Sequence, residues 1–161
     1  MEGQKQHPRA FSFEFFPPKT PEGVQKLGTT WRQLAQLKPR FFSVTYGAGG
    51  STRERTLSTV IDIRQAGFHA APHISCIGSV RADIAQTLEL YRAQGIRHIV
   101  ALRGDLPSGA ASAGELRHAN ELVQFIRERT GDHFHIDVAC YPEFHPQAKS
   151  PQEDIRNFKR K

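Results

Sequence analysis

Residues 11–20 read FSFEFFPPKT and contain a strand signal that is followed directly by a helix signal. The aromatic run favours an extended conformation, and the two prolines end it. Thr20 is a favourable N-cap residue, and Pro21 suits the first position of a helix. An apolar stripe then continues at helical spacing through Val24, Leu27, Trp31 and Leu34. This segment therefore predicts one β-strand and one amphipathic helix.

The strand-then-helix pattern recurs along the chain, with strand centres about 30 residues apart. Further strands are expected at 41–46, 70–77, 98–102 and 136–141. The buried faces of the intervening helices are expected to carry Leu57, Val60 and Ile61, then Ile84, Leu88 and Tyr91, then Leu116, Ala119, Val123 and Ile126. Helix boundaries are predicted at Ser51 with Glu54, at Ser150 with Pro151 and Glu153, and at the closing glycines Gly67, Gly95 and Gly131.

Alternation at this period predicts an α/β fold built on a parallel sheet, and both doubly wound sheets and barrels fit the pattern. The 161 residues are fewer than the ~250 of a complete eight-unit barrel. We expect residues 1–10 to be a flexible N-terminal segment. Residues 11–161 are expected to form about five βα units and to end inside the fifth helix.

The composition is that of a globular chain, with 38% hydrophobic and 24% charged residues. No apolar run approaches the ~20 residues of a membrane span, and the polar start carries no export signal, so a cytoplasmic protein is expected. The net charge of +6 comes from basic residues spread along the chain, so we expect no nucleic-acid partner. A basic nucleic-acid module stays open as an alternative, and it predicts binding that weakens steeply with salt.

Polar residues gather where the predicted strands end, which is where α/β enzymes place their functional groups. They are Glu14, Thr45, Tyr46, His73, Arg103, Gly104, Asp105, Tyr141, Glu143 and His145. Neither the histidines nor the two cysteines, Cys76 and Cys140, show zinc-type spacing, so no metal site is expected. No glycine-rich dinucleotide fingerprint or phosphate loop is present in the sequence.

Each of these residues has a plain interpretation beside the functional one. Glu14 is either a solvent-facing or ion-paired strand residue, or an acid whose flanking phenylalanines disfavour its charged form and suit it to donate a proton. Arg103 and Asp105 either pair with each other or flank a tight turn at Gly104 where an arginine grips phosphate. His73 is either a core histidine or a ligand contact. The residues alone therefore predict an α/β enzyme fragment with a strand-end site for an anionic ligand.

Four motifs carry a more specific signal. They are SFEFFPPKT at 12–20, SVTYGAGG at 43–50, IRHIVALRGDLP at 96–107 and YPEFHPQAKS at 141–150. In this order they closely resemble the N-terminal portion of methylenetetrahydrofolate reductases of the bacterial type, and the resemblance runs from about residue 11 to residue 161.

The resemblance implies a (β/α)8 TIM barrel that carries FAD, of which this chain holds about the first five βα units. It implies reduction of 5,10-methylenetetrahydrofolate to 5-methyltetrahydrofolate with NADH or NADPH, in one-carbon metabolism and methionine supply. It also implies a homo-oligomer for the complete protein.

The same resemblance implies roles for individual residues. Glu14 is similar to the general acid that helps to protonate the folate, Asp105 to the residue beside flavin and pterin, and Thr45 to a nicotinamide contact. The implied flavin contacts are Tyr46, Ala48, His73, Arg103, Gly104, Asp105, His118, Ala119, Tyr141, His145, Ala148, Asp154, Asn157, Arg160 and Lys161. Arg160 and Lys161 would meet the diphosphate.

Three features depart from the family pattern. His118 stands where a tyrosine is common, the second loop carries Gly49 and Gly50, and the later strands that bind folate and nicotinamide are missing. An alternative is therefore a half-barrel that binds FAD partially and is not catalytic. Its exposed sheet edges would favour self-association.

Overall fold

The computed structural model describes residues 10–46, 52–105, 114–141, 143–146 and 148–161. It contains β1 (Ser12–Phe15), α1 (Pro21–Ala35), β2 (Phe41–Val44), α2 (Arg53–Gln65), β3 (Ala70–Ser75), α3 (Arg81–Ala93), β4 (His98–Leu102), α4 (Ala119–Thr130), β5 (His135–Val138) and α5 (Pro151–Arg160). The predicted alternation of strands and helices is confirmed. The segment expected to be flexible, 1–10, lies almost entirely outside the described residues.

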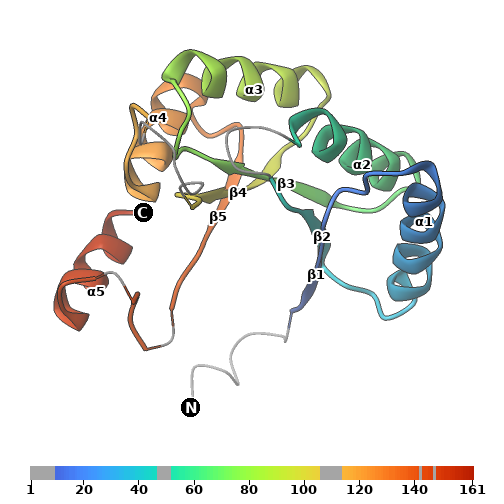
Figure 1. Cartoon of the computed structure of the whole chain (residues 1–161), viewed down its shortest axis with the longest axis horizontal. Helices are drawn as coiled ribbons and strands as arrows, with labels where there is room; N and C mark the ends of the chain where they lie inside the picture. Colours follow the sequence, from blue (N-terminus) through green and yellow to red (C-terminus); the bar gives the residue numbers. More distant parts are fainter. Residues whose placement is uncertain (1–9, 47–51, 106–113, 142, 147) are drawn as a thin grey trace.

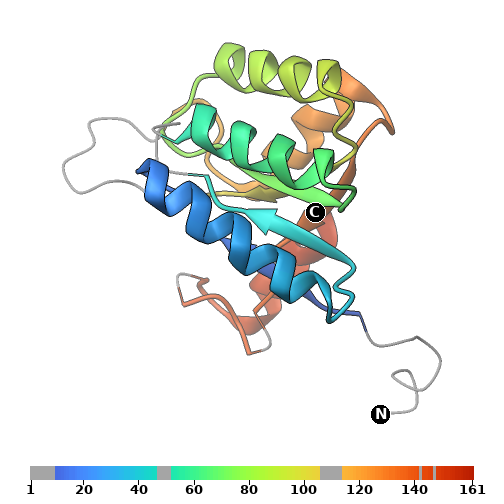
Figure 2. The same ribbon diagram turned by 90° about the vertical axis from the view of Figure 1, so that its right-hand side faces the viewer.

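The five strands form one parallel sheet in which each strand pairs with the next, in the order β1-β2-β3-β4-β5. A doubly wound sheet reverses its strand order at a switch point, so this unbroken order distinguishes the barrel arrangement from the doubly wound one. The sheet curves, and α1 to α4 cover its outer side (Figure 1). In the view from the side, α1, α2 and α3 lie next to one another (Figure 2). The fold is that of the first five βα units of a (β/α)8 barrel.

The hydrophobic core lies between the sheet and these helices. Strand residues such as Phe42 and Ile99 are almost fully buried against helix residues such as Leu88 and Leu122. Because side chains alternate along a strand, the intervening residues lie on the open side of the sheet. That open side carries the polar strand residues discussed below. Among the described residues, no helix is long and apolar enough to cross a membrane.

Most predicted helix boundaries are confirmed. The Thr20 hydroxyl accepts a hydrogen bond from the Gly23 N–H at 3.1 Å, and the Ser150 hydroxyl accepts one from the Glu153 N–H at 3.2 Å. The three closing glycines all have positive φ, at +89° for Gly67, +65° for Gly95 and +57° for Gly131.

The start of α2 differs from the prediction, because Thr52 is its N-cap and Ser51 lies outside the described residues. The buried stripe of α2 was also predicted incorrectly. Val60 is buried as expected, but its buried companions are Ile63, Thr56 and Thr59, whereas Leu57 and Ile61 are only half-buried.

Two further expectations about inward faces need correction. Val24 on α1 is 48% exposed, so only the later part of that stripe packs inward. Leu116 is buried but precedes α4, whose buried residues are Leu122, Val123, Phe125 and Ile126.

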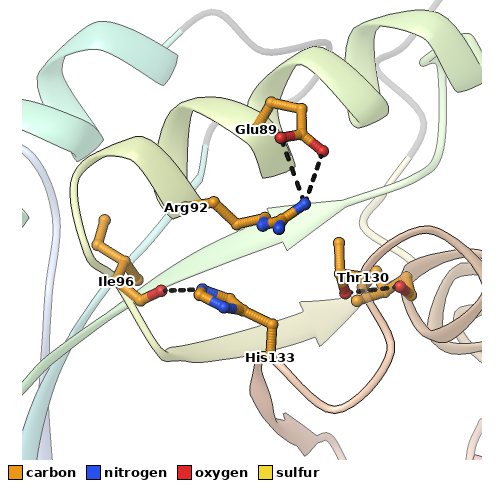
Figure 3. A network of polar contacts seen from close by, with 6 residues as sticks. Glu89, Arg92, Ile96, Thr130 and His133 are labelled. Carbon is orange, nitrogen blue, oxygen red and sulfur yellow. Dashed lines mark hydrogen bonds and ion pairs between the residues drawn. The ribbon is translucent and has the colours of Figure 1, made fainter.

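The connections at the amino-terminal ends of β4 and β5 are held by side chains (Figure 3). The His133 ring contacts the Ile96 carbonyl through Nε2 at 3.1 Å, which ties the α4–β5 turn to the segment before β4. On α3, Arg92 Nη1 lies 3.3 Å from Glu89 Oε1. The His133 contact thus joins two segments at the end of the sheet opposite the candidate site, whereas the Glu89–Arg92 pair lies within α3.

Candidate functional site

A cavity of about 480 Å³ opens at the carboxyl ends of the strands. Its walls are formed by Glu14, Thr45, Tyr46, His73, Ser75, Val100, Leu102, Gly104, Asp105, Val138 and Ala139. Six of these residues were predicted as functional residues, and they come from the ends of four different strands. The structure therefore brings together residues that are up to about 90 positions apart in the sequence, as expected for a parallel βα array.

Glu14 and His73 form the polar centre of this strand-end cavity. Glu14 Oε2 lies 3.5 Å from His73 Nε2, and the two side chains are 56% and 7% exposed. The apolar setting expected for Glu14 is wrong, because strand alternation turns Phe13 and Phe15 to the helix-covered side of the sheet while Glu14 faces the cavity. Of the two plain interpretations, a solvent-facing strand residue that also contacts His73 describes the local geometry better, and it leaves the carboxylate accessible to a ligand.

Burial lowers the pKa of His73, and the charge of Glu14 only partly opposes this effect. The unfolded chain therefore binds a proton at this position more readily than the folded chain does. Stability from this site is complete above the unfolded pKa of about 6.5, and it is lost as the pH falls through the lower folded pKa. At neutral pH the His73 ring is uncharged.

We expect the urea midpoint to fall as the pH is lowered from about 7 to about 5, and to fall less steeply in a His73→Gln variant. Denaturation monitored by circular dichroism at several pH values measures this slope. His69→Gln is the matched control, because His69 is exposed and lies outside the cavity. If the urea midpoint depends on pH equally in the parent chain and in His73→Gln, His73 does not contribute to the pH dependence of stability.

The end of β2 is fixed from α2 and α3. Thr56 Oγ1 donates a hydrogen bond to the Thr45 carbonyl at 2.8 Å. Burial raises the pKa of the Tyr46 phenol, and a hydrogen bond with Thr87 opposes that rise. Tyr46 is therefore held as a neutral phenol at the cavity wall. Ala48, the next predicted contact, lies outside the described residues.

The turn after β4 brings backbone close to the cavity. Gly104 has φ +81°, and a Cβ atom placed on it would lie 2.9 Å from Ser75 Cβ and 3.0 Å from Ile77 Cγ2. Arg103 Nη2 lies 3.8 Å from Asp105 Oδ1, and the Asp105 side chain is fully exposed. The tight turn predicted here is confirmed, and the Arg103–Asp105 contact is long enough to leave the carboxylate open to a ligand.

A second cavity of about 490 Å³ lies beside the first, between the start of α4 and α5. Its walls are formed by Arg103, His118, Ala119, Asn120, Glu121, His145, Ala148, Lys149, Glu153, Asp154, Asn157, Arg160 and Lys161. Nine of these were predicted as cofactor contacts. Tyr141 is the one predicted cofactor contact among the described residues that lines neither cavity. Its ring centroid lies 4.7 Å from that of His145.

Two acidic side chains in this second cavity are engaged by backbone. Glu121 Oε2 accepts hydrogen bonds from the Arg117 and His118 N–H groups at 2.6 and 3.2 Å, and Asp154 Oδ2 accepts one from the His145 N–H at 2.8 Å. Lys161 Nζ donates to the Ala139 carbonyl at 3.1 Å, which links this cavity to the wall of the first. Arginine and lysine side chains at such a wall suit phosphate binding.

Several cavity residues were not predicted. Ser75 could have been found, because it lies two residues after His73 on one strand and so shares its face. Asn120, Glu121, Lys149 and Glu153 flank predicted contacts in the sequence. Val100, Leu102, Val138 and Ala139 carry no polar signal, and only the sheet register places them at the cavity.

A family model described as methylenetetrahydrofolate reductase matches residues 2–161. The 5,10-methylenetetrahydrofolate reductase of Salmonella typhimurium is 48% identical over 151 residues, covering 93% of this chain and 50% of that protein. Its Escherichia coli counterpart is 47% identical with the same coverage. Methylenetetrahydrofolate reductase (NADH) 1 of Arabidopsis thaliana is 38% identical over 166 residues, covering 94% of this chain and 28% of that protein. The chain thus spans about half the length of the bacterial relatives it matches.

Proposed function

Because the chain belongs to the methylenetetrahydrofolate reductase family, we propose that it supplies the flavin site and the acid of an enzyme that reduces 5,10-methylenetetrahydrofolate to 5-methyltetrahydrofolate. FAD is the proposed cofactor, and NADH or NADPH the proposed reductant. The observation that carries this proposal is that residues from four separate motifs line two neighbouring cavities at the strand ends.

The shape of the site fits a long dinucleotide. Arg103 lines the second cavity, while the next two residues, Gly104 and Asp105, line the first. A ligand can therefore follow this turn from one cavity into the other. The positive φ of Gly104 lets the backbone turn between the two cavities, and the basic residues Arg103, Arg160 and Lys161 suit a diphosphate.

When bound, the flavin supplies the hydride chemistry between nicotinamide and folate. The residues of this chain supply position and a proton. Glu14 lines the strand-end cavity, and its carboxyl is the proposed proton donor to the folate. His73 Nε2 lies 3.5 Å from the Glu14 carboxyl, and the exposed Asp105 carboxylate can accept hydrogen bonds from a ligand.

The proposal is tested first by incubating the purified chain with FAD, removing free ligand, and recording the visible absorption spectrum. We expect the visible bands of bound flavin. Bands that bleach under anaerobic NADH or NADPH and return when 5,10-methylenetetrahydrofolate is added would show that this chain supports both half-reactions. Bands that bleach but do not return would favour the alternative of a half-barrel that binds FAD without folate reduction. A colourless protein would contradict the proposed flavin site.

Arg160→Gln should weaken FAD binding about tenfold, because one charge-assisted contact to phosphate is lost. Fluorescence quenching of FAD during titration measures the change. Arg97→Gln removes an exposed arginine that lies just before β4, at the opposite end of the sheet, and should leave affinity unchanged. Equal affinities for all three proteins would exclude Arg160 from the phosphate site.

A further inference from the structure

A second polar cluster lies at the amino-terminal ends of the strands, opposite the proposed flavin site. It consists of His98 on β4 and of His135 and Asp137 on β5. The register pairs His98 with His135, and strand alternation puts Asp137 on the same face as His135. The three side chains therefore converge on the open side of the sheet.

The two histidines contact different oxygens of the Asp137 carboxylate. His98 Nε2 lies 2.8 Å from Asp137 Oδ2, and His135 Nε2 lies 3.2 Å from Asp137 Oδ1. All three ligand atoms lie within 4.8 Å of one another. A tetrahedral Zn²⁺ ion with bonds of about 2.0–2.2 Å requires ligand atoms about 3.3 Å apart. The cluster therefore needs only small side-chain movements to surround such an ion.

We propose that His98, His135 and Asp137 form a binding site for a divalent transition-metal ion of the Zn²⁺ class, which would join β4 to β5. Two imidazoles and one carboxylate are a ligand set that Zn²⁺ uses, with a fourth position left for water. A cavity of about 200 Å³ adjoins all three residues and provides room for that water. The site is separate from the flavin site and does not depend on it.

The adverse feature is Arg40, which lines the same cavity and whose charge opposes a cation. A plain hydrogen-bonded network is the competing description of the cluster. That network needs both Nε2 atoms to carry protons that point at Asp137, whereas a metal ion replaces both protons and satisfies all three groups together. Sequence spacing does not reveal the cluster, because its ligands come from neighbouring strands.

Calorimetric titration of the metal-free chain with ZnCl₂ tests the site. We expect saturable binding of one ion per chain, and a rise of roughly 5–10 °C in the thermal midpoint at hundredfold excess over the dissociation constant. Asp137→Asn and His135→Ala should each weaken binding at least tenfold. The His135 side chain is 67% exposed, so its removal should leave the fold intact, which circular dichroism can confirm.

His69→Ala is the matched control, since it removes an exposed histidine outside the cluster. Binding that is lost in both cluster variants but kept in His69→Ala would support the site. The absence of saturable binding, or binding of equal strength in the parent chain and both cluster variants, would overturn it.

Discussion

A Glu14→Gln variant is expected to reduce the folate roughly 10²- to 10⁴-fold more slowly, while its flavin is still reduced by the nicotinamide nucleotide at nearly the parent rate. Glutamine keeps the size and polarity of glutamate but cannot donate a carboxyl proton. It can also keep the contact with the buried His73, so the cavity wall should stay in place. The effect should therefore fall on the step that needs an acid.

Anaerobic stopped-flow absorbance separates the two half-reactions. The first mixes oxidised enzyme with NADH or NADPH, and the second mixes reduced enzyme with 5,10-methylenetetrahydrofolate. Glu22→Gln is the control, because it neutralises an exposed carboxylate in the first turn of α1 that does not line the cavity. Equal slowing of both half-reactions would mean that Glu14 positions the flavin. Unchanged folate reduction would show that the acid is another group.

The regular alternation of strand and helix signals in the sequence predicted the fold class well, because each βα unit has its own local signals. Thr20 and Ser150 form their expected caps, and three glycines end helices as expected. The choice between a barrel and a doubly wound sheet was beyond these signals. That choice depends on which strands pair, and strand pairing joins segments that are far apart in the sequence. Only the three-dimensional structure shows the order β1-β2-β3-β4-β5.

The errors on α2 have a specific physical cause. Thr56 and Thr59 are buried because their hydroxyls donate to the Thr45 and Arg55 carbonyls, each at 2.8 Å. Hydropathy patterns treat threonine as polar and cannot show that its hydroxyl has a hydrogen-bond partner inside the fold. A strong apolar neighbour such as Ile61 was therefore preferred wrongly over Thr59.

The candidate site shows the same division between local and long-range information. The predicted residues cluster because strand ends meet at one edge of a parallel sheet, which is a general rule. The setting of Glu14 was predicted wrongly because residues adjacent in a strand face opposite sides. The cluster of His98, His135 and Asp137 was missed because it depends on the register between β4 and β5.

A Gly104→Ala variant is expected to lose about 2–5 kcal/mol of unfolding free energy. A non-glycine residue at φ +81° costs about 1–2 kcal/mol, and the new methyl group would approach Ser75 Cβ to 2.9 Å, which adds an overpacking cost of about 1–3 kcal/mol. Because Arg103 and Asp105 flank this turn, relief of the clash would shift both side chains. FAD binding should therefore weaken together with stability.

Gly67→Ala separates the two contributions. Gly67 has φ +89°, but a Cβ atom there would meet nothing within 4 Å, so only the backbone cost of about 1–2 kcal/mol applies. Urea denaturation of both variants, with an unchanged slope, gives the two losses directly. The excess loss in Gly104→Ala measures how tightly β3 packs against the turn after β4. Equal losses would mean that Ser75 and Ile77 move aside freely, and the close backbone approach would then not hold the strand-end cavity in shape.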